Sequence, residues 1–369
     1  MTTKLLERTN DILVRPFSIG RLTLPNRVVM APMTREFSPG GVPGHGVAQY
    51  YARRAAAGIG LIVTEGTYVG HESAGSSARV PHFYGDEALA GWSAVVDAVH
   101  QAGGRIMPQL WHVGMDRMVG NPPVPDAPRI GPSGIALDGT ASGREMTQAD
   151  IDAVIAAYVT AAVSAEALGF DGIEIHGAHG YLIDQFLWAH TNRRTDVYGG
   201  DVIGRTRFAA EIVAACRDSV AGDFPIFFRF SQWKVGHYRA RIAQTPHELE
   251  TMLGLLVDAG VDAFHCSTRR LQFPEFEGSD LNLAGWARKL SGKPAVSVGS
   301  VGLGDEFPHM SPGKVTDIGE LLDRMERDEF DLVAVGRALL GDPEWLTKVL
   351  AGRTDELTHF HGGLLGSLR

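Results

Sequence analysis

The chain has 369 residues, of which 44% are hydrophobic and 21% are charged, and this length allows one large barrel or two ordinary domains. Its net charge of -9 argues against nucleic acid as a partner, because binding phosphates requires a basic surface. Two cysteines, Cys216 and Cys266, are too few for a disulfide framework or a four-thiolate iron–sulfur cluster. The sequence shows neither an apolar signal region nor a membrane-spanning run, so we expect a cytoplasmic protein without a membrane partner.

Short apolar runs alternate with helical stretches along the whole chain. After a polar leader and a turn at 24–27, the first half predicts strands at 28–32, 61–64 and 105–110, with helices at 47–57 and 86–102. A capping box of Thr147 and Asp150 opens an Ala-rich helix at 148–168. The remaining strands are expected at 172–175, 225–230, 261–267, 293–300 and 332–337, and the remaining helices at 205–221, after Thr245, and at 318–327.

Eight buried strands that alternate with helices predict an α/β fold, a TIM (β/α)8 barrel that forms a single domain. A doubly wound sheet is the competitor, but no G-x-G-x-x-G follows the first strand. Residues 113–144 are rich in proline and glycine, so we expect a long loop or hairpin insertion after strand 3. Such an insertion could be a lid, a substrate wall or a decorative surface segment.

In a barrel of this kind, the carboxyl ends of all strands face one mouth, where ligands bind. Glycines after the last two strands suit a phosphate site, and Arg337 would neutralise its charge. Gln109 and Arg229 suit the edge of a flat polar ring, although Arg229 could instead form a salt bridge. The residues at these ends are Thr34, Gly66, Gln109, Trp111, His176, His179, Tyr181, Arg229, His265, Gly299, Ser300, Gly336 and Arg337.

Two imidazoles and a phenol follow the strand at 172–175, on a segment that we expect to be a loop. His176 and His179 could donate hydrogen bonds to a developing oxyanion, and Tyr181 could supply a proton. Each of them could also be an ordinary structural residue. Paired histidines can ligate a metal too, but no Cys or carboxylate is placed as a third ligand, so we expect no metal.

Several motifs together resemble the old yellow enzyme family of flavin-dependent ene-reductases. The resemblance runs in order from about Leu13 to about Leu350, so it covers nearly the whole chain. It rests on A-P-M-T-R at 31–35, Q-L-W at 109–111, the segment 176–181, N-R-R-T-D-V-Y-G-G at 192–200 with Arg205, and G-R at 336–337.

The resemblance implies a non-covalently bound FMN that takes hydride from NADH or NADPH and reduces an activated alkene. Pro32, Met33 and Thr34 would lie against the flavin, Gly66 and Gln109 at its pyrimidine side, and Arg229 near the N1–C2 edge. Its phosphate would lie at Gly299, Ser300, Gly336 and Arg337. The substrate would contact Trp111, His176 and His179, with Tyr181 as proton donor.

Some features depart from the family pattern or leave alternatives open. The fifth strand continues as Phe230-Ser231-Gln232-Trp233-Lys234, which we expect to reshape the loop over the ring. The basic segment 265–270 could meet an acidic substrate or the nicotinamide cofactor's phosphates. A Gly-Ser pair at 299–300 leaves the phosphate donors open.

Two rival functions stay open at this point. One is a non-redox barrel lyase or isomerase acting on a phosphorylated substrate. The other is a relative of larger dehydrogenases, for which the chain lacks cluster cysteines and length. The physiological alkene, the choice between NADH and NADPH, and the oligomeric state are not determined by the sequence.

Overall fold

Eight parallel strands close into a barrel in the part of the chain that the structure, a computed structural model, describes: residues 3–304 and 314–369. Each strand pairs with the next one along the chain, and β12 closes the ring by pairing with β3. The predicted (β/α)8 barrel is therefore confirmed. Its strands are β3 (Val28–Met30), β4 (Leu61–Tyr68), β5 (Ile106–Trp111), β8 (Ile173–His179), β9 (Ile226–Lys234), β10 (Ala263–Ser267), β11 (Ala295–Val298) and β12 (Leu332–Val335).

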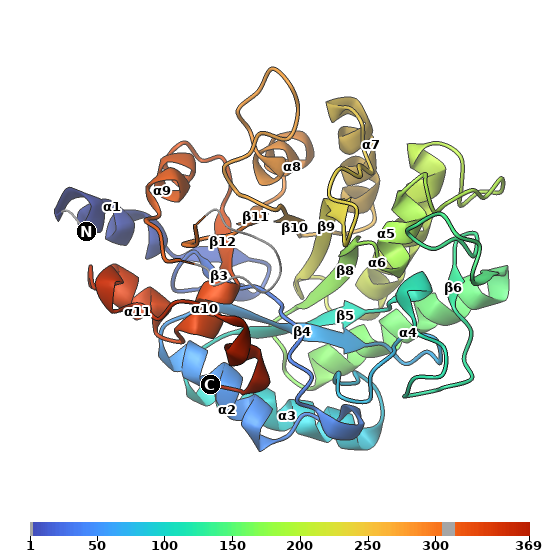
Figure 1. Cartoon of the computed structure of the whole chain (residues 1–369), viewed down its shortest axis with the longest axis horizontal. Helices are drawn as coiled ribbons and strands as arrows, with labels where there is room; N and C mark the ends of the chain where they lie inside the picture. The colour runs from blue at the N-terminus through green and yellow to red at the C-terminus, as the bar shows by residue number, and fades with distance from the viewer. Residues whose placement is uncertain (1–2, 305–313) are drawn as a thin grey trace.

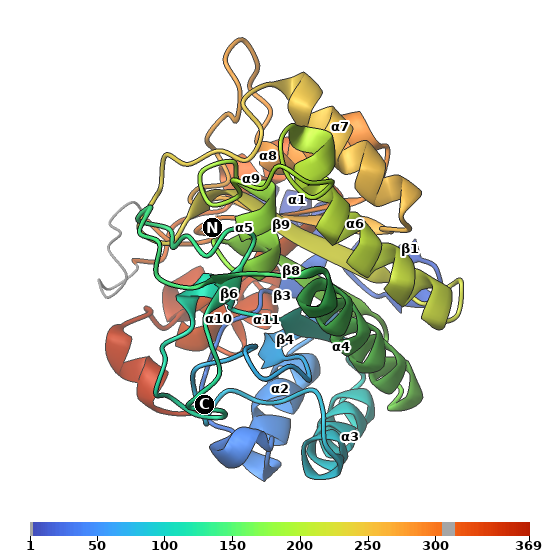
Figure 2. The same ribbon diagram turned by 90° about the vertical axis from the view of Figure 1, so that its right-hand side faces the viewer.

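Helices surround the barrel on its outside, as the two views in Figures 1 and 2 show. Local signals set several of their starts: Thr147 completes a capping box for α4, and Thr245 accepts a hydrogen bond from the Glu248 amide at α7. The outer helices are α2 (His45–Ala56), α3 (Asp86–Gln101), α4 (Gln148–Ala167), α5 (Leu182–Leu187), α6 (Val202–Ser219), α7 (Pro246–Asp258), α8 (Leu283–Ser291), α9 (Gly319–Glu326), α10 (Arg337–Gly341) and α11 (Trp345–Leu350). Among the described residues, no helix has the length and apolar character needed to cross a bilayer.

Two elements at the N-terminus were not predicted. The leader forms a helix, α1 (Thr3–Leu13), and a hairpin follows it, β1 (Phe17–Ile19) with β2 (Leu22–Leu24). Leu22 and Leu24 pack against the alternate strand residues that fill the barrel, among them Val29, Leu61 and Phe227. The hairpin thus belongs to the apolar core of the barrel interior, away from the polar strand ends.

The strands at the mouth extend further than the sequence suggests. The prediction that His176 and His179 lie in a loop is wrong, because both belong to β8, which runs to His179. The segment 230–234 is also strand, so the expected loop over the ring is an extension of β9. Backbone pairing between β8 and β9 continues past a bulge at Gly177 to join His179 with Lys234.

The insertion after β5 is compact and contains little regular structure. It holds a 3-10 turn at Gly114–Asp116 and two short strands, β6 (Ile130–Gly131) and β7 (Arg144–Glu145), which pair in parallel. The expected hairpin is reduced to one antiparallel bridge between Ile135 and Ala141. The insertion also contacts the turn that follows β8. Leu137 lies so close to Gly180 that a Cβ added to this glycine would be 2.6 Å from Leu137 Cδ1.

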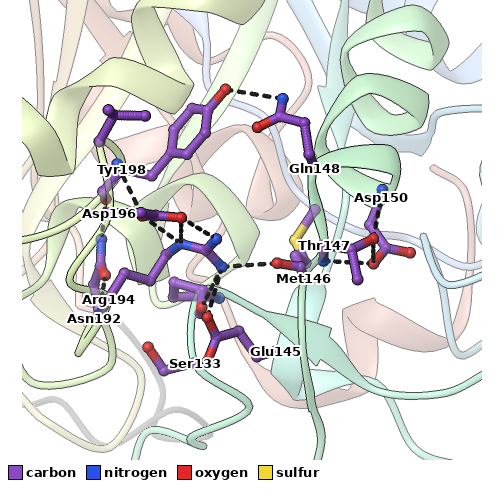
Figure 3. Close-up of polar contacts among 12 residues, drawn as sticks. Ser133, Glu145, Met146, Thr147, Gln148, Asp150, Asn192, Arg194, Asp196 and Tyr198 are labelled. Atoms are coloured by element: carbon purple, nitrogen blue, oxygen red, sulfur yellow. Dashed lines mark hydrogen bonds and ion pairs between the residues drawn. The ribbon is translucent and has the colours of Figure 1, made fainter.

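One arginine fastens this insertion to the segment 192–200 (Figure 3). Nη1 of Arg194 donates to the carbonyl oxygens of Pro132 and Met146 at 2.9 and 2.8 Å, and it lies 3.2 Å from Glu145 Oε1. The same side chain pairs with Asp196 from within its own segment. The contacts give Arg194 and Asp196 of this segment a structural role.

We expect Arg194→Ala to destabilise the fold by about 2–4 kcal/mol, because the replacement leaves several buried carbonyl groups without a donor. Urea unfolding measures the loss, and limited proteolysis should cut within 113–144 faster than in the unmodified protein. Arg193→Ala is the matched control, since Arg193 is exposed and its Nε makes one hydrogen bond, to the His190 carbonyl. Equal stability of the two variants would contradict the anchoring role.

Candidate active site

A layer of polar side chains caps the apolar interior of the barrel at the carboxyl ends of four strands. Strand register places Gln109 beside Glu174, and His176 beside Arg229, which in turn lies beside His265. Gln109, Arg229 and His265 each follow by two residues an apolar member of the interior core: Met107, Phe227 and Ala263. Because strand side chains alternate between faces, this spacing turns them into the barrel.

Glu174 is the centre of this layer and is wholly buried. Gln109 Nε2 donates to its Oε1 at 2.8 Å, and His265 Nδ1 lies 2.6 Å from its Oε2. Burial alone would raise the pKa of Glu174, yet the hydrogen bonds from His265 and Gln109 and the charge of Arg229 hold it below its usual value. Burial lowers the pKa of His265, so we assign a neutral imidazole that donates from Nδ1 to an ionised carboxylate.

Arg229 is buried beside this carboxylate, and its Nε has no hydrogen-bond partner among the described residues. A buried guanidinium N–H without an acceptor is costly, so the site favours a ligand that supplies one. The proposal of a simple structural salt bridge for Arg229 does not account for this N–H.

His176 and His179 stand at right angles at the end of β8, with ring centroids 5.2 Å apart. The Ala178 amide donates to His176 Nδ1 at 3.2 Å, so the proton of a neutral His176 lies on Nε2. His179 Nε2 lies 2.8 Å from the Ser267 hydroxyl. Burial lowers the pKa of both histidines well below the usual value, and the charge of Arg229 adds to the effect. Both rings are therefore neutral hydrogen-bond donors near pH 7.

Tyr181 lies against His176 and Trp111, with ring centroids 5.1 Å and 4.8 Å away. Burial raises the pKa of its phenol, so Tyr181 keeps its proton at neutral pH. Trp111 stacks near His176 at 6.1 Å, and its ring also occupies the space beside Gly66, where a Cβ would lie 2.5 Å from Cε3. Any side chain at Gly66 would displace Trp111.

A buried ion pair holds the segment that carries Tyr181. Lys234 Nζ lies 2.9 Å from Asp184 Oδ1, and neither side chain is exposed. Asp184 Oδ2 in turn accepts from the Gly180 amide at 2.6 Å. Burial raises the pKa of Asp184 to about 6, against the opposing effect of Lys234. The pair links the end of β9 to the turn at Gly180, where φ of 92° favours glycine.

One pocket collects seven of the residues predicted to bind a cofactor. Its lining includes Pro32, Met33, Arg229, Gly299, Ser300, Gly336 and Arg337. Arg337 Nη2 donates to Ser300 Oγ at 3.2 Å, and Ser300 Oγ donates to the Arg269 carbonyl at 3.1 Å. A Cβ at Gly299 would lie 2.4 Å from Thr268 Oγ1, so a larger residue cannot replace it without movement. Burial and the nearby charges of Arg270 and Arg269 lower the pKa of Arg337, as expected where cations gather around an anion site.

The remaining predicted residues lie outside this pocket. Thr34 is exposed just past β3, and Gly66 and Gln109 pair across β4 and β5. His265 does not point outward as the basic segment 265–270 suggested, because Glu174 holds it inside the barrel. Sequence reasoning missed Glu174, although its spacing of two from His176 in one strand places both on the same face. It also missed Asp184, for which no sequence signal stands out.

These features describe a closed parallel barrel with a polar mouth and a pocket at its strand ends that is lined by glycines and arginines. The model of the NADH:flavin oxidoreductase / NADH oxidase family matches residues 12–356. The chain therefore belongs to this family, the old yellow enzyme family; it is an enzyme, and FMN is its cofactor. The unpartnered Nε of Arg229 and the arginines around Ser300 fit a flavin ring and a phosphate.

Individual relatives agree with this assignment. An NADH oxidase of Thermoanaerobacter brockii is 35% identical over 348 residues, covering 92% of this chain and 50% of the relative. The 12-oxophytodienoate reductase 7 of Oryza sativa subsp. japonica is 41% identical over 223 residues, 57% of this chain and 56% of its own. The structure of morphinone reductase superposes with a TM-score of 0.79 at 28% identity, covering 96% of this chain and 92% of the other. The chain spans about half the length of the first two of these relatives.

Six buried or half-buried histidines make stability depend on pH. Their lowered pKa values mean that, below the ordinary value of 6.5, the unfolded chain binds protons that the folded chain does not. The free energy of unfolding should therefore fall as pH drops below 6.5, by up to about 1.4 kcal/mol per pH unit for each histidine. The six residues are His71, His82, His112, His176, His179 and His265.

Four carboxyl groups act in the opposite direction. Burial raises the pKa of Glu65 to about 7 and that of Asp184 to about 6, and it also raises the pKa of Asp116 and Glu275, so the folded chain binds these protons first. Six histidines outweigh four carboxyl groups, and urea unfolding of the holoenzyme between pH 8 and pH 5 should show a net loss. A free energy of unfolding that stays level or rises toward pH 5 would contradict the assignment of neutral histidines.

Proposed function

We propose that the chain is an FMN-dependent ene-reductase that uses NADH or NADPH to reduce the activated C=C bond of an α,β-unsaturated carbonyl, nitro or quinone-type compound. The observation that carries this proposal is the placement of His176, His179 and Tyr181 around one point, beside the buried Arg229. One neighbouring structure, that of morphinone reductase in complex with tetrahydroNAD, supports a nicotinamide cofactor as the reductant.

The residues around the mouth divide between the cofactor and the substrate. Arg337, Ser300 and the backbone at Gly299 and Gly336 would hold the FMN phosphate, and Arg229 Nε would donate to the ring. Because Nε2 of Gln109 already donates to Glu174, its Oε1 and second amide hydrogen are left for the pyrimidine side. Pro32, Met33, Thr34 and Gly66 would line the ring where no long side chain intrudes.

The substrate would bind with its carbonyl oxygen between the two histidines. When bound, FMN accepts hydride from the nicotinamide and passes it to the β-carbon of the alkene. His176 donates from Nε2 to the carbonyl oxygen, on which negative charge develops, and one such donor contributes about 3–4 kcal/mol in comparable enzymes. His179 donates from Nδ1 when the Ser267 hydroxyl donates to its Nε2. Tyr181 gives its phenolic proton to the α-carbon, and Trp111 packs against that phenol.

A non-redox lyase acting on a phosphorylated substrate would use the same histidines and tyrosine without a flavin. Family membership favours the flavin enzyme, and the purified protein should accordingly be yellow. Two histidines alone do not make a metal site: among residues 3–304 and 314–369, no cluster of three His, Cys, Asp or Glu side chains could hold a metal ion. A requirement for a metal is not expected.

Tyr181→Phe should separate the two halves of the reaction. The change removes one hydroxyl and keeps the ring against Trp111, so FMN content and its reduction by the nicotinamide should stay within a few-fold of the unmodified enzyme. Reoxidation by cyclohexenone should slow by roughly 10²–10⁴, because the α-carbon loses its proton donor. Reoxidation by a quinone, which needs no protonation at carbon, should slow much less. Stopped-flow absorbance measures all three rates.

The outcome can go against the proposal in two ways. Tyr181 has a structural role if reoxidation of the flavin by the enone and by the quinone slows equally. The same conclusion follows if the rate of flavin reduction by the nicotinamide falls sharply. Tyr158→Phe is a matched control, since Tyr158 is a buried core residue of α4. This substitution should leave the ratio of the two reoxidation rates, by the enone and by the quinone, unchanged.

Arg337→Ala should weaken FMN binding by about tenfold or more, because hydrogen bonds to charged groups contribute about 1.5–3 kcal/mol. The barrel should stay folded, since Arg337 is only half-buried and donates a hydrogen bond to the side chain of Ser300. Fluorescence titration of the apoprotein with FMN measures the dissociation constant. An unchanged dissociation constant for FMN would remove Arg337 from the phosphate site. Arg353→Ala is the control for the loss of a positive charge, because Arg353 lies on the exposed surface.

A further inference from the structure

The turn between β8 and α5 has an unusual backbone. His179 has a φ of 66° and Gly180 has a φ of 92°, so two successive residues adopt left-handed conformations. Glycine adopts such a conformation readily, but in other residues the Cβ atom crowds the backbone. A strained residue of this kind persists only where its surroundings fix it. The backbone of His179, a proposed oxyanion donor, therefore depends on the groups that bind it.

The extension of β9 binds both polar backbone groups of His179. The His179 amide donates to Ser231 Oγ at 3.0 Å, and the His179 carbonyl accepts from the Val235 amide at 3.2 Å. The Ser231 hydroxyl donates onward to the Trp233 carbonyl at 2.7 Å, which leaves its lone pairs for the His179 amide. Ser231 is wholly buried, so its hydroxyl is shielded from bulk water.

Side chains of α5 bind both polar backbone groups of Gly180. Asp184 Oδ2 accepts from the Gly180 amide at 2.6 Å, and Gln185 Nε2 donates to the Gly180 carbonyl at 2.7 Å. Tyr181 follows Gly180 directly, and its carbonyl accepts from the Gln185 amide at 2.8 Å. These bonds set the position from which the Tyr181 phenol leaves the turn. The proposed oxyanion donor and the proposed proton donor are thus held by one set of contacts.

Lys234 holds the Asp184 carboxylate in place. Its Nζ lies 2.9 Å from Asp184 Oδ1, and neither side chain is exposed. Nζ also donates to the carbonyl oxygens of Gln232 and Ser231 at 2.7 and 3.3 Å. Apolar side chains of similar volume can often replace a buried ion pair without loss of stability. Stability alone therefore does not explain these two charges. What the pair supplies specifically is a carboxylate directed at the Gly180 amide.

We propose that Ser231, Asp184 and Lys234 are positioning residues that clamp this turn for reduction of the alkene. Through the amides of His179 and Gly180, they keep the imidazole directed at the substrate oxygen and the Tyr181 phenol directed at the carbon that it protonates. All three side chains are buried, so they act through the turn and not by contact with the substrate. This inference rests on the proposed function and deepens it, because it assigns control of the substrate site to groups behind it. Without the clamp, His179 relaxes toward negative φ, and its ring and the phenol move together.

Two double variants separate the hydrogen bond to Gly180 from the buried charges. Asp184→Asn/Lys234→Met removes both charges together and keeps a side-chain oxygen that can accept from the Gly180 amide. Asp184→Leu/Lys234→Met also removes both charges but leaves that amide without an acceptor. Neither variant contains an unpaired buried charge, so we expect both to fold. The difference between them therefore measures the effect of the acceptor.

Three measurements on the FMN-loaded enzyme report on different parts of the site. Binding of 4-methylphenol to the oxidised enzyme, followed by absorbance titration, reports on the histidines, because the phenol oxygen takes the place of the substrate carbonyl oxygen. Stopped-flow reoxidation of the dithionite-reduced enzyme by cyclohexenone reports on the histidines and on Tyr181. Reoxidation by ferricyanide is the control for the flavin itself, because this one-electron acceptor needs neither a hydrogen bond to a carbonyl nor a proton at carbon.

Asp184→Leu/Lys234→Met should weaken phenol binding and slow reoxidation by cyclohexenone, each by about tenfold or more, because both depend on the geometry of the turn. Reoxidation by ferricyanide should change less than about twofold, since no positioned donor takes part in it. Asp184→Asn/Lys234→Met should stay within about threefold of the unmodified enzyme in all three measurements, because the acceptor for the Gly180 amide is kept.

Two results with the double variants would overturn the inference. One is unchanged phenol binding together with an unchanged ratio of the cyclohexenone and ferricyanide rates in Asp184→Leu/Lys234→Met. The other is an equal loss in both double variants, because the acceptor would then make no difference. Asp342→Leu/Lys348→Met is the matched control: this mostly buried pair, 2.7 Å apart between α10 and α11, also has a carboxylate that accepts from backbone amides. Its removal should leave the phenol and cyclohexenone values unchanged.

Ser231→Ala tests the clamp with the ion pair intact, and it decides the question if the double variants do not fold. The change removes the acceptor of the His179 amide, so phenol binding should weaken by about threefold or more. Unchanged phenol binding in Ser231→Ala would overturn the clamp. If the unmodified enzyme binds the phenol but cyclohexenone does not reoxidise it, the proposed function fails, while the phenol titrations still decide whether the turn is clamped.

Discussion

The carboxylate of Glu174, buried at the top of a closed barrel, is the constraint on which the mouth of this protein depends. A buried carboxylate without partners costs several kcal/mol, so the surrounding strands must supply donors. Gln109 from β5 and His265 from β10 provide them at 2.8 and 2.6 Å, and Arg229 from β9 adds a positive charge. The same contacts orient the Gln109 amide and leave Arg229 Nε for a ligand, so one buried charge organises the cofactor side of the site.

The edge between β8 and β9 organises the substrate side. The bulge at Gly177 lets pairing resume between His179 and Lys234, and this places Lys234 against Asp184 below the turn that carries Tyr181. The extension of β9 also brings Trp233 against His179. One irregular strand pair thus connects the proposed oxyanion donors and the proposed proton donor.

The insertion shows how a long segment without regular structure is held in one place. Arg194 contacts Pro132 within it and Met146 just after it, while Leu137 packs over Gly180 beside Tyr181. The insertion therefore forms part of the surroundings of the site. This position favours the hypothesis of a substrate wall over that of a decorative segment, because movement of Leu137 would change the space beside the tyrosine.

The sequence by itself determined the barrel, because buried parallel strands are short apolar runs and their number and alternation with helices are readable from the chain. It also placed the titratable residues at strand ends, since each follows such a run directly. Tertiary structure alone decided which of them meet. His265 turned inward because Glu174, 91 residues away, offers a carboxylate, and the strand extensions at His179 and Lys234 formed because each strand stabilises the other. Such pairings depend on partners distant in the chain, and local patterns of hydrophobicity carry no information about them.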